Sequence, residues 1–153
     1  MYRKNICVVL IDDAREHLLM FRRVGAQDYY WQFPQGGIDT GESDTQAMYR
    51  ELKEEIGTND VEILKIAESW IKYDFPGWVQ ENMRNKGHKP LYQGQEQRWY
   101  LARLKQGTAS IRFDYQPAEF DGFEWVEPQR IIERVIPFKR PAYTQGLKAL
   151  GVF

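Results

Sequence analysis

Short apolar runs with a two-residue alternation recur along the chain, separated by polar segments rich in Gly, Pro, Asn and Asp. This pattern predicts β-strands, which we place at residues 6–11, 17–24, 31–34, 61–75, 97–104 and 123–126. We expect segment 17–24 to be the hairpin partner of the first strand, and segment 61–75 to be one long or bent strand. A helical period follows at 44–56, after Pro128 and again after Pro137. Strands alternating with two or three helices predict an α/β fold with a mixed sheet covered on both faces, an α/β/α sandwich.

Residues 76–95 show no apolar period and contain scattered Pro, Gly, Asn and Lys, so we expect a surface loop there. Loops of this length are uncommon unless they are functional or disordered. The basic side chains of this segment are Arg84, Lys86, His88 and Lys89. A run of solvated surface charges is slightly favoured over a substrate-binding role for these side chains. A metal-binding role for His88 is disfavoured because it has no partner ligand.

The helix expected at 44–56 has clear signals at both ends. Ser43 is a preferred N-cap residue with Gln46 three positions later, which is the spacing of a reciprocal capping pair. Gly57 stands where a left-handed C-cap belongs. The sequence therefore predicts this helix from about Asp44 to Ile56.

One face of this helix carries more acid than a solvated surface needs. Glu51, Glu54 and Glu55 share that face. Carboxylates at this spacing repel one another, which favours a cation among them over a simple solvated face. Hard divalent cations such as Mg²⁺ take oxygen ligands and keep water and substrate phosphates in their remaining positions. We expect Arg50 to reach back to Glu42 and hold the preceding glycine turn against the helix.

These residues form a motif with fixed spacing that begins at Gly36 and Gly37. Five residues separate Gly36 from Glu42, and seven more precede Arg50, which is followed by Glu-Leu-Lys-Glu-Glu-Ile-Gly. The motif resembles the signature box of the Nudix hydrolases, which cleave a nucleoside diphosphate linked to another group. It departs from that box only at its last position, where Thr58 replaces an aliphatic residue. The resemblance implies the same sandwich fold and a single Nudix domain over residues 1–153.

Within the superfamily, the chain is similar over nearly its whole length to bacterial RNA pyrophosphohydrolases and the related dinucleoside polyphosphate hydrolases. The resemblance implies several Mg²⁺ ions, with Mn²⁺ as an alternative. Their implied ligands are a backbone carbonyl at Gly36 and the carboxylates of Glu51, Glu54, Glu55 and Glu119. The resemblance also implies that Arg23 and Phe138 sandwich a base. The residues that it places near the phosphates or the base are Arg3, Tyr73, Gln95 and Lys139.

Some of these assignments have plainer alternatives. Arg23 on a strand can equally be a solvated edge charge, and Phe138 after a proline break can be a core aromatic. The catalytic carboxylates are taken to be Glu51, Glu54 and Glu119. The proton acceptor must lie within reach of the attacking water, and the sequence does not choose between Glu119 and Glu51.

Composition limits the setting in which the protein works. The 153 residues are 42% hydrophobic and 28% charged, which is ordinary for one globular domain. No apolar run approaches the roughly 20 residues that span a bilayer, and the start of the chain is too polar for a signal peptide. The single cysteine, Cys7, lies in an apolar strand and agrees with a reducing compartment. We therefore expect a cytoplasmic protein with no membrane partner, and a homodimer is left open.

The net charge of −1 argues against nonspecific nucleic-acid binding through overall positive charge, although basic residues gather outside the acidic helix. Aromatic residues make up 14% of the chain, and we expect some of those at Tyr29, Tyr30 and Trp31 to stack on bases. Three functions remain: an RNA 5′ pyrophosphohydrolase, a hydrolase of dinucleoside polyphosphates or nucleoside triphosphates, and a binding module without catalysis. The basic residues and stacking aromatics favour RNA.

Overall fold

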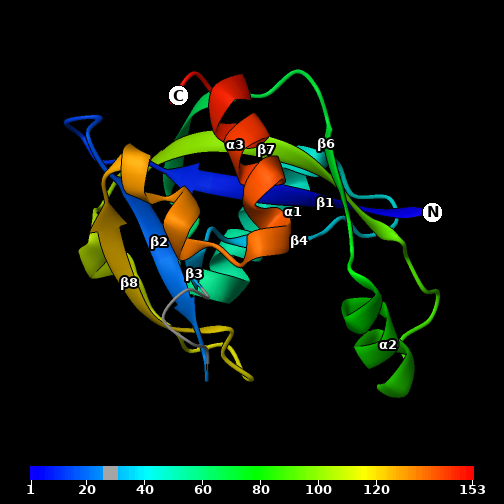
Figure 1. Ribbon diagram of the computed structural model, residues 1–153. Coiled ribbons are helices and arrows are strands. Elements are labelled where there is room, and N and C mark those ends of the chain that lie inside the picture. The colour runs from blue at the N-terminus through cyan, green and yellow to red at the C-terminus, as the bar shows by residue number, and fades with distance from the viewer. Residues whose placement is uncertain (26–30) are drawn as a thin grey trace.

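A five-stranded mixed sheet organises the chain in the computed structural model, which describes residues 1–25 and 31–153 (Figure 1). Strand β1 (Tyr2–Leu10) pairs in parallel with β7 (Gly94–Leu104), and β4 (Gln35–Gly37) pairs antiparallel with β1. Strands β5 (Val61–Ile66) and β6 (Ile71–Asp74) both pair antiparallel with the long β7. The predicted strand 61–75 is therefore two strands that share one partner.

A second sheet of three antiparallel strands has the order β3-β2-β8. It contains β3 (Trp31–Gln32), β2 (Leu18–Arg23) and β8 (Phe120–Val126). The predicted hairpin between the first two strands is wrong, because a single bridge between Ile11 and Leu18 joins them before β2 turns to pair with β8. The first four residues of β2 are all buried and alternate between two apolar cores, and its two edges pair with β3 and β8.

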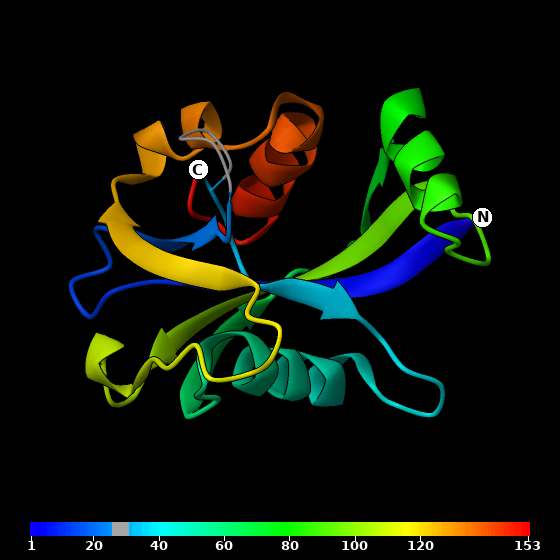
Figure 2. The same cartoon turned by 90° about the horizontal axis from the view of Figure 1, so that it is seen from below.

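Helices cover both faces of the sheets, which confirms the predicted α/β/α sandwich (Figure 2). On one face, α1 (Asp44–Ile56) packs over the β7 residues Tyr100 and Ala102. On the other face, α3 (Arg140–Ala149) packs over Trp99 and Leu101. The predicted alternation of side chains along β7 is thus confirmed, and it divides the apolar interior into two cores.

The region after β6 differs from the sequence prediction. Residues 76–95 contain α2 (Gly77–Asn85), which lies on the same side of the sheets as α3 (Figure 2). None of the residues of α2 is buried, so the helix shows no core-facing apolar stripe to reveal it. The helical period after Pro128 forms the short 3₁₀ turns η2 (Pro128–Arg130), η3 (Ile132–Arg134) and η4 (Pro137–Lys139), and η1 (Thr108–Ser110) is a further one. Among the described residues, none of the helices has the length and hydrophobicity needed to cross a bilayer.

Candidate functional site

Helix α1 presents the acidic residues and has the predicted bounds and caps. The Ser43 hydroxyl accepts a hydrogen bond from the Gln46 amide at 3.1 Å, and the Gln46 side chain accepts one from the Ser43 amide at 2.9 Å. Gly57 ends the helix with a φ of 78°, which a residue with a side chain rarely adopts. These local interactions fix the start and end of the helix and therefore the direction of its carboxylates.

Arg50 ties α1 to the glycine turn that precedes it. Its guanidinium donates two hydrogen bonds to Glu42 and one, from Nη2 at 2.8 Å, to the Gly37 carbonyl oxygen. Its Nη1 lies 2.9 Å from Oε1 of Glu51. Hydrogen bonds from Arg50 and from the Asp39 amide lower the pKa of the Glu42 carboxyl to about 2. The turn and the helix thus form one unit, as expected from the sequence.

The four predicted carboxylates line one cavity of about 370 Å³. Glu51, Glu54 and Glu55 come from α1, and Glu119 comes from the loop just before β8. Burial raises the pKa of Glu55 well above its ordinary value, and the charges of Glu51 and Glu119 raise it further. Burial also raises the pKa of Glu51, against the lowering effect of Arg50. We call this space the acidic cavity.

Two glycines allow charged side chains to lie directly on the turn backbone. A Cβ on Gly36 would lie 1.9 Å from the carboxylate carbon of Glu51, and a Cβ on Gly37 would lie 2.3 Å from Nη2 of Arg3. Any side chain at either position would displace a charged group. The glycines therefore let Glu51 and Arg3 line the same acidic cavity.

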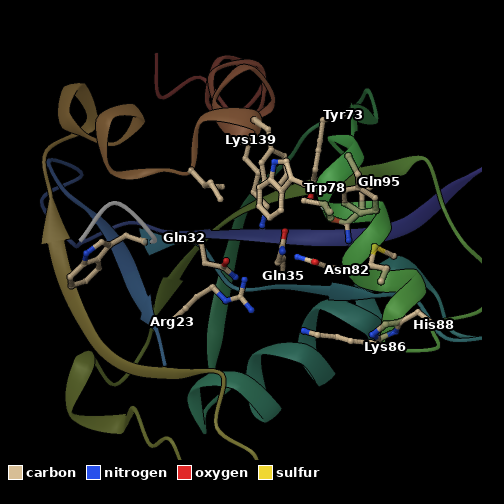
Figure 3. A pocket seen from close by; sticks show the side chains of 16 residues that line it. Arg23, Gln32, Gln35, Tyr73, Trp78, Asn82, Lys86, His88, Gln95 and Lys139 are labelled. Atoms are coloured by element: carbon tan, nitrogen blue, oxygen red, sulfur yellow. Dashed lines mark hydrogen bonds between the residues drawn. The ribbon is translucent and has the colours of Figure 1, made fainter. Parts of the chain in front are cut away.

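A second cavity of about 380 Å³ adjoins the first and is rich in aromatic side chains. Tyr73, Trp78 and Phe138 line it, with Phe138 in contact with both of the others at ring-centre distances of 6.1 and 5.9 Å. The two cavities share four lining residues, Arg23, Gln32, Gln35 and Gln95. Figure 3 shows Arg23 and Gln32 on one side of this aromatic cavity, with α2 on the other.

Polar groups at the border of the two cavities are held in fixed orientations. The Gln95 carbonyl oxygen accepts hydrogen bonds from Nδ2 of Asn5 at 2.9 Å and from the Tyr73 hydroxyl at 2.7 Å. This arrangement leaves the Gln95 amide group as a hydrogen-bond donor for a ligand. Nearby, burial and the charge of Arg23 lower the pKa of the Lys139 ammonium to about 8. The Gln95 amide and the Lys139 ammonium can each donate a hydrogen bond to a phosphate or a base.

Comparison with known proteins agrees with this geometry. The family model described as NUDIX domain matches residues 1–146. The chain belongs to the Nudix family. An RNA pyrophosphohydrolase from Saccharophagus degradans is 44% identical over 153 residues, covering 98% of this chain and 86% of that protein. One from Legionella pneumophila is 42% identical over 152 residues, covering 97% and 83%. The structure of the E. coli dihydroneopterin triphosphate pyrophosphohydrolase has a TM-score of 0.67 and 18% identity, covering 95% of this chain and 96% of that chain, which shows the same fold.

Nudix proteins generally use divalent metal cations, and the acidic cavity fits such ions. Its donors are carboxylate oxygens, and the buried Glu55 lies beside other acids with no cation bonded to it among the described residues. No three His, Cys, Asp or Glu side chains of the described chain are arranged around a single point. Mg²⁺ commonly takes a few carboxylate ligands and completes its shell with water and phosphate oxygens.

The predicted site residues of the Nudix chain are divided between the two cavities. Arg3, Gly36, Gly37 and the four acids line the acidic cavity, while Tyr73, Phe138 and Lys139 line the aromatic one. Arg23 and Gln95 lie at the border. Glu42 and Arg50 hold the glycine turn to α1 and Gly57 caps the end of this helix, and none of the three lines either cavity. Tyr29 and Tyr30 lie outside the described residues, whereas Trp31 lines the aromatic cavity.

Sequence reasoning missed the residues that α2 contributes. Trp78, Asn82 and Met83 line the aromatic cavity, and so do Lys86 and His88 just beyond the helix, for which a substrate contact was the less favoured of two interpretations. A signal was present in the four-residue spacing from Trp78 to Asn82 and on to Lys86, which is typical of one helix face. The prediction of a loop for residues 76–95 did not take this helical spacing into account.

Proposed function

We propose that this protein is a Mg²⁺-dependent RNA pyrophosphohydrolase that converts 5′-triphosphate RNA ends to 5′-monophosphate. The single observation that carries the proposal is the junction of the two cavities, because a polyphosphate in the acidic cavity would place its attached nucleotides beside the aromatic one. Two proteins named RNA pyrophosphohydrolase, at 44% and 42% identity, support this choice of substrate. Water displaces pyrophosphate, or phosphates in steps.

The acidic residues would hold the ions. Glu54, Glu55 and Glu119 would serve as ligands together with the Gly36 carbonyl, with Glu51 beside them in the acidic cavity. When bound, Mg²⁺ neutralises the charge that develops on the phosphates and makes a bound water more acidic. Arg3, which also lines the acidic cavity, would orient the triphosphate through charge-assisted hydrogen bonds. In this proposal, the protein acts mainly by positioning the substrate and compensating its charge.

The carboxylates of Glu51 and Glu119 differ in how firmly they are held. Glu51 is hydrogen-bonded to Arg50 and lies against the backbone of Gly36, whereas Glu119 is exposed on a loop. A proton acceptor has to keep a fixed position relative to the water it activates. We therefore assign the acceptor role to Glu51 and a metal-binding role to Glu119.

The nucleotide would be held by stacking in the aromatic cavity. Arg23 and Phe138 line it from different elements, β2 and η4, and would clamp a base between a guanidinium plane and a ring. A dinucleoside polyphosphate also presents a polyphosphate joined to bases and would fit the same pair of cavities. Hydrolysis of such dinucleotides is the second candidate function.

Product analysis tests the proposal directly. RNA labelled in its 5′-triphosphate is incubated with the protein and Mg²⁺, and the released phosphates and the new RNA end are separated. We expect pyrophosphate or phosphate together with 5′-monophosphate RNA, and no reaction when a chelator removes the cation. An unchanged triphosphate end, with tight RNA binding, would favour a binding module without catalysis.

A further inference from the structure

The outer wall of the aromatic cavity comes from α2, a helix with no buried residue. Trp78 on this helix is 54% exposed, yet it is not an isolated surface tryptophan. Its ring meets Phe138 nearly at right angles, at 84°, with the ring centres 5.9 Å apart. The aromatic surface that begins at Phe138 therefore continues onto α2 and remains open to solvent.

The end of α2 adds positive charge to the same wall. The segment 77–93 has one acidic residue, Glu81, and three basic residues, Arg84, Lys86 and Lys89. Each of the three is exposed, and none of them forms an ion pair within the described part of the chain. Lys86 and His88 line the cavity, and Figure 3 shows both beyond the end of α2 that lies away from Trp78. In a chain with a net charge of −1, this local excess favours an anionic partner.

We propose that α2 and the turn after it bind the RNA on the 3′ side of the clamped base, an inference that rests on the proposed function. Trp78 stacks on the next base, and Lys86 contacts a backbone phosphate. The perpendicular rings of Phe138 and Trp78 suit two bases that are turned away from each other. Single-stranded RNA is commonly recognised with its bases unstacked in this way and laid on aromatic side chains.

Helix α2 would in this way take part in substrate selection. A free nucleoside triphosphate has no second or third nucleotide to reach the helix. An RNA of three or more nucleotides can contact both the clamp and α2. The helix would therefore raise the efficiency on RNA relative to free nucleotides while leaving the chemistry at the acidic cavity to other residues.

A series of substrates of increasing length tests the role of Trp78. kcat/KM is measured for GTP and for 5′-triphosphate RNAs of two, three and four nucleotides. In the parent protein we expect kcat/KM to rise between two and three nucleotides. Trp78→Ala should lower kcat/KM for the trinucleotide about fivefold or more, which is the effect of one lost stacking contact, with a smaller loss for the dinucleotide and GTP. Trp125→Ala removes an exposed tryptophan outside both cavities and should change none of these values.

Equilibrium binding without divalent cations tests Lys86 in the absence of turnover. Fluorescence anisotropy with a 3′-labelled triphosphate trinucleotide gives the affinity at several salt concentrations. Lys86→Gln should reduce the slope of log affinity against log salt by about 0.7, the value for one phosphate contact in a single strand. Lys148→Gln, an exposed lysine on α3 outside both cavities, is the control and should leave the slope unchanged.

Several outcomes would overturn the inference. Equal losses for GTP and the trinucleotide in Trp78→Ala would place Trp78 at the first nucleotide, and no loss on any substrate would leave it without a role in binding. If the parent protein has the same kcat/KM for the dinucleotide and the trinucleotide, the inference is refuted while the proposed function stands. A parent protein inactive on every triphosphate RNA would refute both.

Discussion

Arg50 donates two hydrogen bonds to the carboxylate of Glu42, from Nε at 2.7 Å and from Nη2 at 2.9 Å. The same guanidinium reaches Glu51 and the backbone of the glycine turn. Lysine cannot reproduce this planar fork of donors. Arg50→Lys should therefore lower kcat about tenfold or more and reduce the melting temperature by about 2–4 °C, the shift expected from 1 kcal/mol in a chain of this size. Steady-state kinetics and thermal unfolding measure the two effects.

Arg103 provides a matched control for that substitution. It also bridges two carboxylates, those of Asp13 and Glu62, but it lines neither cavity. Arg103→Lys should leave kcat unchanged and alter stability little, because exposed ion pairs contribute little. If Arg50→Lys has no larger effect on kcat than Arg103→Lys, Arg50 does not position the site.

Replacing an acid of the metal site should abolish turnover while the protein remains folded. Glu55→Gln removes a buried charge, and its amide oxygen can still accept the hydrogen bond from the Gln35 amide. Its melting temperature should hold or rise. Glu54→Gln should behave similarly in kinetics. At saturating Mg²⁺, either variant retaining more than about a tenth of the parent kcat, a loss below about 1.4 kcal/mol, would contradict the metal assignment. Glu68→Gln, an exposed acid outside both cavities, is the control.

The proposed clamp predicts a loss that depends on the substrate. Phe138→Ala and Arg23→Ala should each weaken RNA binding by about 1–3 kcal/mol through lost stacking, and kcat/KM for triphosphate RNA should fall accordingly. The loss for GTP should be smaller if the clamped base lies beyond the first nucleotide. Phe123→Ala, an exposed phenylalanine outside both cavities, serves as the control. A Phe138→Ala variant with a lower melting temperature and unchanged kinetics on both substrates would make Phe138 a core residue only.

The buried Lys139 predicts a pH-dependent difference in stability. Burial lowers its pKa from the ordinary 10.5 to about 8, so the unfolded chain binds more protons between these values and stability rises with pH through that window. Lys139→Met removes the penalty of burying the charge. The variant should be more stable than the parent by about 3 kcal/mol at pH 7, and the difference should shrink between pH 8 and 10.5. Urea unfolding at several pH values measures it, and a variant less stable than the parent at pH 7 would be contrary to this account.

The sequence was most informative where structure depends on neighbouring residues. The bounds of α1 were predicted because Ser43, Gln46 and Gly57 act within one turn of the helix ends. The contact between Arg50 and Glu42 spans only eight positions and followed from the same local geometry. The alternation along β7 was predicted because each face of that strand packs on a different apolar core.

Features that depend on distant segments could not be predicted in this way. The pairing of β2 with β8 joins Leu18 to Val126, and nothing near β2 indicates so remote a partner. Helix α2 has no buried residue and is only nine residues long, so its short apolar spacing, such as Val79 and Met83, is a weak signal beside the scattered Pro, Gly, Asn and Lys around it. The burial of Lys139 likewise arises from the surrounding fold, because a lysine after a phenylalanine carries no local sign that it is enclosed.

A comparison of three substrates on one preparation tests the central claim most directly. kcat/KM is measured with Mg²⁺ for a 5′-triphosphate RNA of at least four nucleotides, diadenosine tetraphosphate and free GTP. The adjoining cavities, with Trp78 and Lys86 on the wall of the aromatic one, predict that RNA is the best substrate, by about tenfold or more. Only RNA can add a further stacking contact at Trp78 and a backbone phosphate contact at Lys86 to what the polyphosphate and a first clamped base provide. Equal or higher kcat/KM for diadenosine tetraphosphate or GTP would contradict the claim that this protein is an RNA pyrophosphohydrolase.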